Sequence, residues 1–175
     1  MYIIYILSFI PLLTNMPKDM HYRKILSYLY SLESPTIKLG LGRMQELLGK
    51  IENPEKKLKC VHIAGTNGKG SVCAMLQYVL MESGYKIGMY TSPHLKKFNE
   101  RIRINNDLMT DREIVHYFLK IKPHVTSQSF FEITTAMAFL YFYEKKADIV
   151  ILEVGLGGRL DATNVVKPLV SVITN

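Results

Sequence analysis

One stretch of the sequence carries the residue types of a phosphate-binding loop. In "CVHIAGTNGKGSVCAM", residues 60–75, three glycines (Gly65, Gly68 and Gly70) surround Lys69, and Ser71 follows. Glycines let a backbone curl around an anion with its N–H groups pointing inward, and a helix that begins there adds the positive end of its dipole. The lysine can reach the outer phosphates of a nucleotide, and the serine hydroxyl can contact phosphate or magnesium.

The spacing of this loop departs from the common nucleotide-binding pattern. That pattern has four residues between its first glycine and the Gly-Lys pair, whereas here Thr66 and Asn67 alone separate Gly65 from Gly68. A tight glycine turn with a solvated lysine is the alternative. The apolar run before the loop and the helical pattern after it favour the phosphate site.

A carboxylate ends a second apolar run. Glu153 follows four apolar residues, 149–152, and open α/β sheets bind their ligands at the carboxyl ends of such strands. A carboxylate beside a phosphate loop commonly holds magnesium, directly or through water. We predict this role for Glu153, with a partly exposed strand-end glutamate as the alternative.

The loop that follows Glu153, "GLGGRLDATN" at residues 155–164, combines three glycines with four polar groups. These groups are Arg159, Asp161, Thr163 and Asn164. We expect them at the ligand edge of the sheet, although plain solvation of a surface loop would also explain the composition.

Two further side chains have weaker signals. His94, in the loop "TSPHL", could act as a base or a ligand, but a lone loop histidine is more often simply exposed. Glu132 precedes a strongly apolar run, where a first-turn carboxylate would be favoured by the helix dipole.

Strands must alternate with helices to position these groups. Apolar spacing and helix-start signals predict helices over residues 21–32, 41–48, 71–83, 110–121 and 131–143. Strands are predicted over 60–64, 86–90, 101–104, 149–153 and 168–175. Two of these strands are continuously apolar, which favours a parallel sheet covered on both faces. The predicted fold class is α/β, with a parallel sheet flanked by helices and a phosphate-binding loop.

Several local details follow from the same patterns. Thr110 and Glu113 form a capping box at a helix start, and the helix over 131–143 is apolar around most of its circumference, so it should be buried on several sides. The alternation in "RIRI", 101–104, suggests a short exposed strand. The buried face of the 71–83 helix is expected to comprise Val72, Met75, Leu76, Val79 and Leu80.

Composition bounds the class of protein. The chain has 175 residues, 48% of them hydrophobic, and a formal net charge of +7, which suits one globular domain with anionic partners. The positive charge is spread along the chain, so nucleic acid is not an expected partner. Cys60 and Cys73 match no metal spacing or disulfide framework, and buried thiols of this kind indicate a reducing, cytoplasmic location.

The first nineteen residues differ from the rest. Residues 1–13 are strongly apolar but short for a bilayer span, and they lack the features of a signal peptide. We expect residues 1–19 to be an extension outside the fold, with the structured part at 20–175 and no membrane association. Membrane anchoring through residues 1–13 is the alternative.

The motifs together resemble one family. "HIAGTNGKGS", "YTSPHL", "ERIRI", "FFEITT" and "EVGLGGRLDATN" occur in this order, and they are similar to the N-terminal ATPase domain of folylpolyglutamate synthases and bifunctional dihydrofolate synthases, within the Mur ligase superfamily. The resemblance extends from about Met20 to Asn175. It implies an architecture like the central domain of Mur ligases, in truncated form.

The resemblance also implies an activity. The family joins L-glutamate to dihydropteroate or folate with ATP and Mg²⁺: the substrate carboxylate attacks the γ-phosphate to give an acyl phosphate, and the glutamate amine then displaces phosphate. Lys69 is the catalytic residue that the resemblance implies. The expected partners are these small molecules alone, and the full-length form is expected to be a monomer.

The family's functional positions transfer residue by residue. The ATP phosphate loop corresponds to Thr66, Asn67, Gly68, Lys69, Gly70 and Ser71, and the magnesium ligands correspond to Ser92 and Glu153. The dihydropteroate or folate site corresponds to Ser31, Leu32, Glu33, Ser34, Ser129, Leu160, Asp161 and Ala162.

The resemblance has limits. Lys38 and Gly42 stand where the family often has acidic residues. Beyond the "TN" at the end, the family continues to a histidine of the magnesium site, a modified lysine, adenine contacts and a C-terminal domain. We therefore expect little or no ligase activity from these residues alone. A Mur-type amino-acid ligase and a non-catalytic nucleotide-binding module that docks to a partner remain as alternatives.

Overall fold

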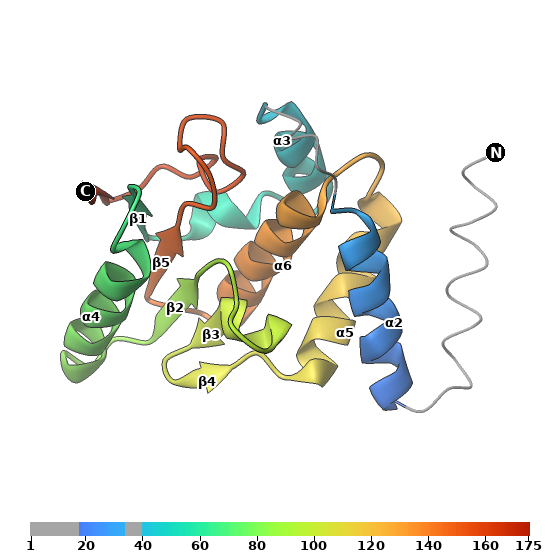
Figure 1. Ribbon diagram of the computed structural model, residues 1–175, viewed down its shortest axis with the longest axis horizontal. Helices are drawn as coiled ribbons and strands as arrows, with labels where there is room; N and C mark the ends of the chain where they lie inside the picture. Colours follow the sequence, from blue (N-terminus) through green and yellow to red (C-terminus); the bar gives the residue numbers. More distant parts are fainter. Residues whose placement is uncertain (1–17, 34–39) are drawn as a thin grey trace.

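The computed structural model describes residues 18–33 and 40–175 of the chain. Their centre is a six-stranded sheet in the order β4-β3-β2-β5-β1-β6 (Figure 1). In chain order the strands are β1 (Cys60–Ala64), β2 (Ile87–Tyr90), β3 (Ile102–Ile104), β4 (Asp107–Leu108), β5 (Ile149–Glu153) and β6 (Val170–Ile173). Four of them, β2, β5, β1 and β6, run parallel, and β3 and β4 extend the sheet in antiparallel fashion.

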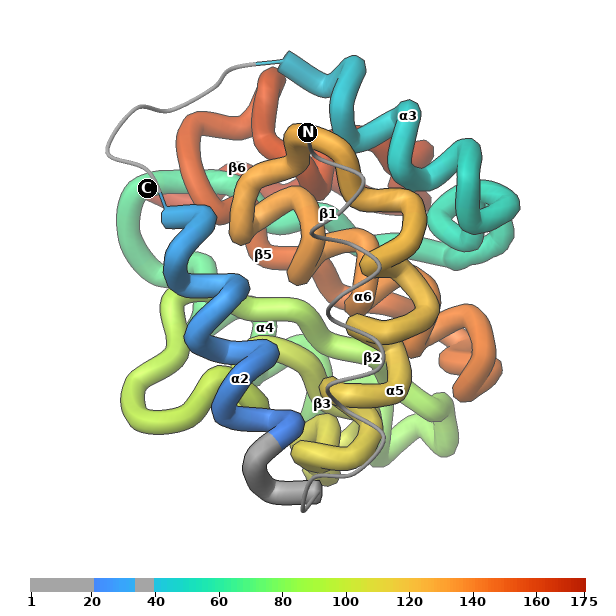
Figure 2. Tube along the Cα trace, turned by 90° about the vertical axis from the view of Figure 1, so that its right-hand side faces the viewer, coloured from blue at the N-terminus to red at the C-terminus, as the bar shows by residue number. Residues whose placement is uncertain are grey.

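Helices cover the two faces of this sheet unequally. Figure 1 shows α4 on one side of the strands and α6, α5 and α2 on the other. The helices are α2 (Lys18–Ser31), α3 (Gly42–Lys50), α4 (Lys69–Glu82), α5 (Asp111–Ile121) and α6 (Phe130–Glu144), with short 3₁₀ turns at Pro54–Lys57, Phe98–Arg101 and Lys122–His124. In Figure 2, seen from the side of α2, that helix lies alongside α5.

The larger core lies between the sheet and the helices α2, α3, α5 and α6. Helix α6 is its centre: every residue from Ile133 to Phe142 is buried, as predicted from a sequence that is apolar around most of the helix circumference. Both helices α5 and α6 begin with a capping box, at Thr110 with Glu113 and at Ser129 with Glu132. The first of these boxes was predicted from the sequence, and it fixes where α5 starts.

The smaller core lies between α4 and the opposite face of the sheet. Cys73 of α4 packs there with Val61, Ile63, Met89 and Ile151. Gln77 of the same helix donates a 2.5 Å hydrogen bond to the carbonyl oxygen of Asn105, next to β3. That bond joins α4 to the turn that follows β3.

The structure corrects several details of the sequence prediction. Met75 and Val79, expected in the buried face of the helix, are 66% and 63% exposed, because the face of α4 that packs on the sheet is the one that carries Cys73 and Gln77. The strand "RIRI" is not exposed: Ile102 and Ile104 are buried. The prediction that both faces of the sheet are covered is also wrong at the edge strand β6, because most residues of that strand are exposed.

Two further details differ from the sequence prediction. Helix α4 begins at Lys69, two residues before the predicted start at Ser71, so the lysine of the glycine-rich loop belongs to the first helical turn. The sheet is mixed and only mostly parallel, since β2 and β3 pair antiparallel.

No helix within residues 18–33 and 40–175 is long and apolar enough to cross a bilayer. The predicted extension, 1–19, lies almost entirely outside the described residues.

Candidate functional site

The sheet has a topological switch between β5 and β1. From β1 the chain passes through α4 to β2, on one side of β5, whereas from β5 it passes to β6, on the other side of β1. Neighbouring parallel strands whose connections leave in opposite directions open a crevice at their carboxyl ends, where α/β proteins bind ligands. The glycine-rich loop after β1 and the loop after β5 both start at this crevice.

The first of these loops has the geometry of an anion cradle. Gly68 caps α4 in the left-handed region, with φ of +80°, and no side chain caps the helix. The first N–H groups of α4 therefore have no side-chain cap and are available to a ligand. The Lys69 ammonium folds back over the loop and donates to the carbonyl oxygens of Gly65 at 2.9 Å and Thr66 at 3.3 Å.

The end of β6 holds this loop in place. Thr174 donates from its hydroxyl to the Asn67 carbonyl oxygen at 2.6 Å, and Asn67 donates from its backbone N–H to the Asn175 carbonyl oxygen at 2.7 Å. Gly65 has a φ of +138°, and a Cβ atom there would lie 2.0 Å from the Thr174 hydroxyl oxygen. The loop thus requires glycine at position 65 because another strand packs directly against it.

Glu153, at the end of β5, lies beside this cradle. One of its carboxylate oxygens, Oε2, accepts a 2.9 Å hydrogen bond from the backbone N–H of Ser92. The other, Oε1, lies 3.7 Å from the point where a Cβ atom of Gly70 would stand. Burial raises the pKa of Glu153, and the Ser92 N–H and the Lys69 ammonium partly oppose that rise.

The two predicted magnesium ligands therefore meet at one place. Among the described residues no group of three His, Cys, Asp or Glu side chains could hold a metal ion. Magnesium, however, usually takes only one or two protein oxygens and completes its shell with phosphate oxygens and water. Glu153 and Ser92, next to a phosphate cradle, fit that kind of site.

A cavity of about 1050 Å³ adjoins the crevice. Its walls come from the end of α2, the segment that leads into α6, and the loop after β5. Of the residues predicted to contact dihydropteroate or folate, six line it: Leu32, Glu33, Ser129, Leu160, Asp161 and Ala162. Ser92 lines it too, so one residue borders both the cavity and the Glu153 carboxylate.

One predicted residue, Ser31, does not contribute to this lining. Ser31 is exposed, and its hydroxyl donates to the Tyr28 carbonyl oxygen at 2.7 Å, which ends α2. Ser34 lies outside the described residues. None of the phosphate-loop residues, 66–71, lines this cavity.

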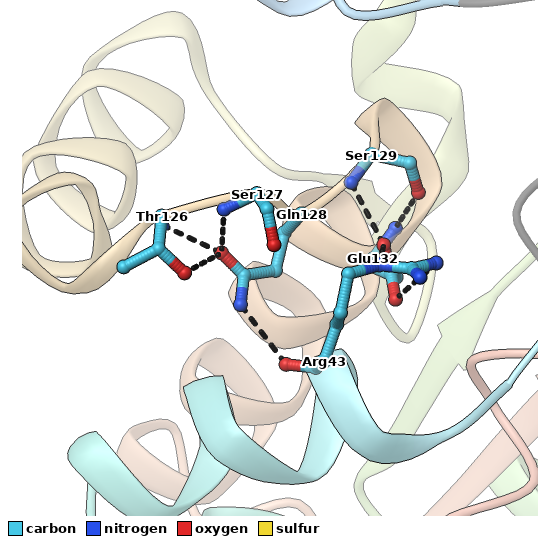
Figure 3. Close-up of polar contacts among 6 residues, drawn as sticks. All are labelled: Arg43, Thr126, Ser127, Gln128, Ser129 and Glu132. Atoms are coloured by element: carbon cyan, nitrogen blue, oxygen red, sulfur yellow. Dashed lines mark hydrogen bonds and ion pairs between the residues drawn. The ribbon is translucent and has the colours of Figure 1, made fainter. Parts of the chain in front are cut away.

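The start of α6 forms a braced wall of the cavity (Figure 3). Glu132 accepts from the Ser129 N–H at 2.8 Å and forms an ion pair with Arg43 of α3, at 3.2 Å. Gln128 accepts from the Thr126 N–H at 2.8 Å and donates to the Arg43 carbonyl oxygen at 3.0 Å. Glu132 is thus a structural carboxylate that caps α6 and joins it to α3, in addition to its favourable position at the helix dipole.

A buried cation, Arg101, also lines the cavity. Its Nε donates to His94 Nδ1 at 2.8 Å, and its guanidinium lies 5.0 Å from the centre of the Phe130 ring. Burial and this guanidinium lower the pKa of His94. His94 is therefore a hydrogen-bonded neighbour of Arg101, with its other nitrogen 3.4 Å from the Tyr30 hydroxyl.

Neither Arg101 nor Gln128 is predicted as a site residue from the sequence. Arg101 lies in a strand-like alternation, where a charged residue is ordinarily solvent-facing, and its burial follows from the turn at Phe98–Arg101. Gln128 gives no local signal, because its link to α3 is a hydrogen bond to the Arg43 carbonyl oxygen, 85 positions earlier in the sequence.

The polar groups in the loop after β5 serve mainly the loop itself. The Asp161 carboxylate is buried and accepts from the N–H groups of Gly155 and Leu156, at 3.0 and 2.9 Å. Asn164 donates to the Arg159 carbonyl oxygen at 3.0 Å. The cavity wall is consequently a loop with its own internal hydrogen bonds, and Arg159 is exposed at its tip.

Comparisons with known proteins agree with this arrangement. No protein-family model matches the chain. It is 49% identical over 148 residues to the dihydrofolate synthase/folylpolyglutamate synthase of Bacillus subtilis (strain 168), a match that covers 79% of this chain and 34% of that protein.

Solved structures share the fold. Escherichia coli FolC in complex with DHPP and ADP superimposes with a TM-score of 0.83 at 41% identity, over 87% of this chain and 37% of that one. A bifunctional folylpolyglutamate synthase/dihydrofolate synthase with Mn, AMPPNP and L-glutamate bound gives a TM-score of 0.81 at 40% identity, with the same coverage of 87% and 37%. The chain spans little more than a third of the length of these proteins.

Proposed function

Since this chain belongs to the folylpolyglutamate/dihydrofolate synthase family, we propose that it forms the part of an ATP-dependent ligase that binds the ATP phosphates and the substrate carboxylate. The whole reaction would join L-glutamate to dihydropteroate or folate. The observation that carries this proposal is the position of Ser92, which borders the large cavity and donates to Glu153 beside the phosphate loop.

The chemistry asks for these two sites to be adjacent. An oxygen of the substrate carboxylate attacks the γ-phosphorus of ATP, the bond to the bridging oxygen breaks, and ADP leaves with an acyl phosphate as the other product. The glutamate amine then attacks the acyl carbon, loses a proton, and displaces phosphate. A substrate in the cavity would present its carboxylate at Ser92, and a nucleotide on the loop would present its γ-phosphate near the same residue.

Each group of the site has a role in this proposal. The N–H groups at the start of α4 and the Lys69 ammonium bind the phosphates and neutralise the charge that moves during transfer. Glu153 and Ser92 would hold a divalent cation, proposed to be magnesium, which when bound supplies further neutralisation of phosphate charge. The aromatic and polar walls of the cavity orient the pterin-bearing substrate.

Nucleotide binding by the chain tests the first half of the proposal. We expect AMPPNP to bind in the presence of Mn²⁺ or Mg²⁺, and we expect Lys69→Ala to weaken binding at least about tenfold, since a charge-assisted contact is lost. Lys50→Ala, an exposed lysine on α3, is the matched control. Absence of AMPPNP binding by the unmodified chain, or equal binding by both variants, would refute the phosphate role.

Substrate binding tests the second half. We expect titration with dihydropteroate or folate to give saturable binding, and competition between the two would indicate a shared cavity. Binding of a nucleotide-linked cell-wall precursor in place of dihydropteroate would identify a Mur-type ligase instead. AMPPNP binding with no acceptor substrate of either class would identify a nucleotide-binding module without ligase chemistry.

A further inference from the structure

His62 has a polar partner that the proposed reaction does not use. It lies in the middle of β1, two residues before the strand ends, and it is buried. Its Nε2 atom lies 2.8 Å from the hydroxyl oxygen of Thr163, a residue with no exposed surface. Thr163 belongs to the loop after β5, so this contact joins the strand that carries the phosphate loop to the loop that walls the cavity.

The number of available protons determines which atom is the donor in the hydrogen bond between His62 and Thr163. The Thr163 hydroxyl also lies 2.5 Å from Asp161 Oδ1. A carboxylate only accepts, so the single hydroxyl proton of Thr163 is donated to Asp161. His62 must then carry a proton on Nε2 and donate it to the Thr163 oxygen. The result is a buried chain of hydrogen bonds that runs from His62 through Thr163 to Asp161.

The Asp161 carboxylate in turn shapes the loop. Besides the hydroxyl, Oδ1 accepts from the Thr163 N–H at 2.9 Å, and Oδ2 accepts from the N–H groups of Gly155 and Leu156. These donors lie on both arms of the loop, so the carboxylate fastens one arm to the other. Both arms line the cavity.

The loop has little freedom to adjust if this fastening changes. A Cβ atom at Gly155 would lie 2.5 Å from the Phe131 ring, so one arm already packs closely against α6. Movement of Asp161 would therefore move Leu156 and Leu160 relative to the cavity and would not be absorbed at the base of the loop.

We propose that His62 is a positioning residue: through Thr163 it holds the Asp161 carboxylate in the orientation that closes the loop at residues 155–164 into the wall of the cavity. The effect on ligand affinity rests on the proposed function, whereas the effect on loop order does not. Burial lowers the pKa of His62 and the nearby Asp161 opposes this, which agrees with a neutral ring that has one N–H to donate.

Three variants of the full chain separate this role from plain packing. His62→Gln keeps a donor at the distance of Nε2, His62→Leu keeps the bulk without the donor, and Thr163→Val removes the link from the other end. We expect faster amide hydrogen exchange at Gly155, Leu156 and Thr163 in the Leu and Val variants, with near-normal exchange in the Gln variant. Amides of β5, such as that of Val150, are the internal reference and should keep their protection.

Ligand affinities complete the test. In the Leu and Val variants we expect dihydropteroate binding to weaken about tenfold, the equivalent of one buried hydrogen bond, and AMPPNP binding to change less than about twofold. The Gln variant should restore dihydropteroate binding. Equal weakening of both ligands would indicate a general loss of structure and would overturn the proposal.

The outcomes are separable from the proposed function. If the unmodified chain binds no dihydropteroate while the exchange pattern changes as expected, the proposed function fails and the positioning role stands. If loop exchange in Thr163→Val equals that of the unmodified chain, the positioning role is refuted. Should His62→Leu fail to fold, the Thr163→Val result decides, because valine has nearly the shape of threonine.

Discussion

The backbone N–H of Ser92 donates a 2.9 Å hydrogen bond to Oε2 of Glu153. The two residues are 61 positions apart, and they meet because β2 and β5 pair in parallel and end at the same edge of the sheet. A neutral donor is therefore fixed against a buried carboxylate, and the same serine lines the cavity. This single contact joins the proposed nucleotide and substrate sites.

Replacing this carboxylate separates its metal role from its structural role. Glu153→Gln keeps an oxygen that can accept from Ser92 but removes the negative charge. We expect AMPPNP affinity in Mn²⁺ to fall at least about tenfold, because a carboxylate is the stronger ligand for a divalent cation. Titrations with and without Mn²⁺ measure this, and an unchanged dependence on Mn²⁺ would exclude Glu153 as a metal ligand.

The same variant has an expected effect on stability. Burial raises the pKa of Glu153 above its ordinary value, so the ionised form is less favourable in the folded protein than in the unfolded chain. Stability from this group is present at low pH and declines as the pH rises through the raised pKa. At pH 7 Glu153→Gln should therefore be at least as stable as the unmodified chain in urea unfolding, and clear destabilisation would contradict this assignment.

The glycine at position 65 should be intolerant of any side chain. Gly65→Ala puts a Cβ atom into the Thr174 hydroxyl and forces a φ of +138° on alanine. We expect a loss of about 1–3 kcal/mol in the free energy of unfolding from the backbone strain, together with weaker AMPPNP binding. Gly68→Ala is a graded comparison, since its φ is +80° but the added atom meets nothing within 4 Å; an equal or larger loss there would show that the contact with Thr174 is unimportant.

Removal of Arg43 should destabilise the protein mainly because it leaves the Glu132 carboxylate buried without its cation. The attraction between the two charges should contribute less. Arg43→Met leaves the Glu132 carboxylate without its cation in a buried position. We expect destabilisation of about 1–3 kcal/mol, below the range for fully buried pairs, because the arginine is partly exposed. Adding Glu132→Gln to this variant should recover part of the loss, and a double-mutant cycle in urea measures the recovery. Strict additivity of the two losses would rule out the coupling.

Acid should destabilise the protein partly through His62. Burial lowers its pKa below the ordinary 6.5, so the unfolded chain gains a proton at a higher pH than the folded protein does. Stability therefore declines as the pH falls below about 6.5, at no more than about 1.4 kcal/mol per pH unit from this group. Comparing urea unfolding at pH 7.5 and 5.5, we expect His62→Gln to lose less stability than the unmodified chain, and an identical loss would contradict the assignment.

Local patterns were sufficient for most of the secondary structure. The strand over 60–64 and the helix that starts after Thr110 appear where apolar runs and a capping box predicted them. Such signals depend on neighbours within one or two turns, so they can be read along the chain. The motif residues are equally local, and for that reason the glycine-rich loop at 65–71 could be proposed as a phosphate site before its surroundings were known.

Long-range contacts decided the rest. Which face of α4 is covered depends on how the helix packs on β1, β2 and β5, so Met75 and Val79 had the periodicity of core residues and are nevertheless exposed. The role of Asp161 depends on a series of hydrogen bonds that runs from Asp161 through Thr163 to His62. His62 lies 101 positions before Thr163 in the sequence. The sequence by itself determined which residues are candidates for the chemistry and which strands and helices they adjoin. Only the tertiary structure decided which polar groups face the cavity and which form hydrogen bonds within its walls. The reason is that strand order and register bring those partners together, and neither can be read from the residue spacing of a single segment.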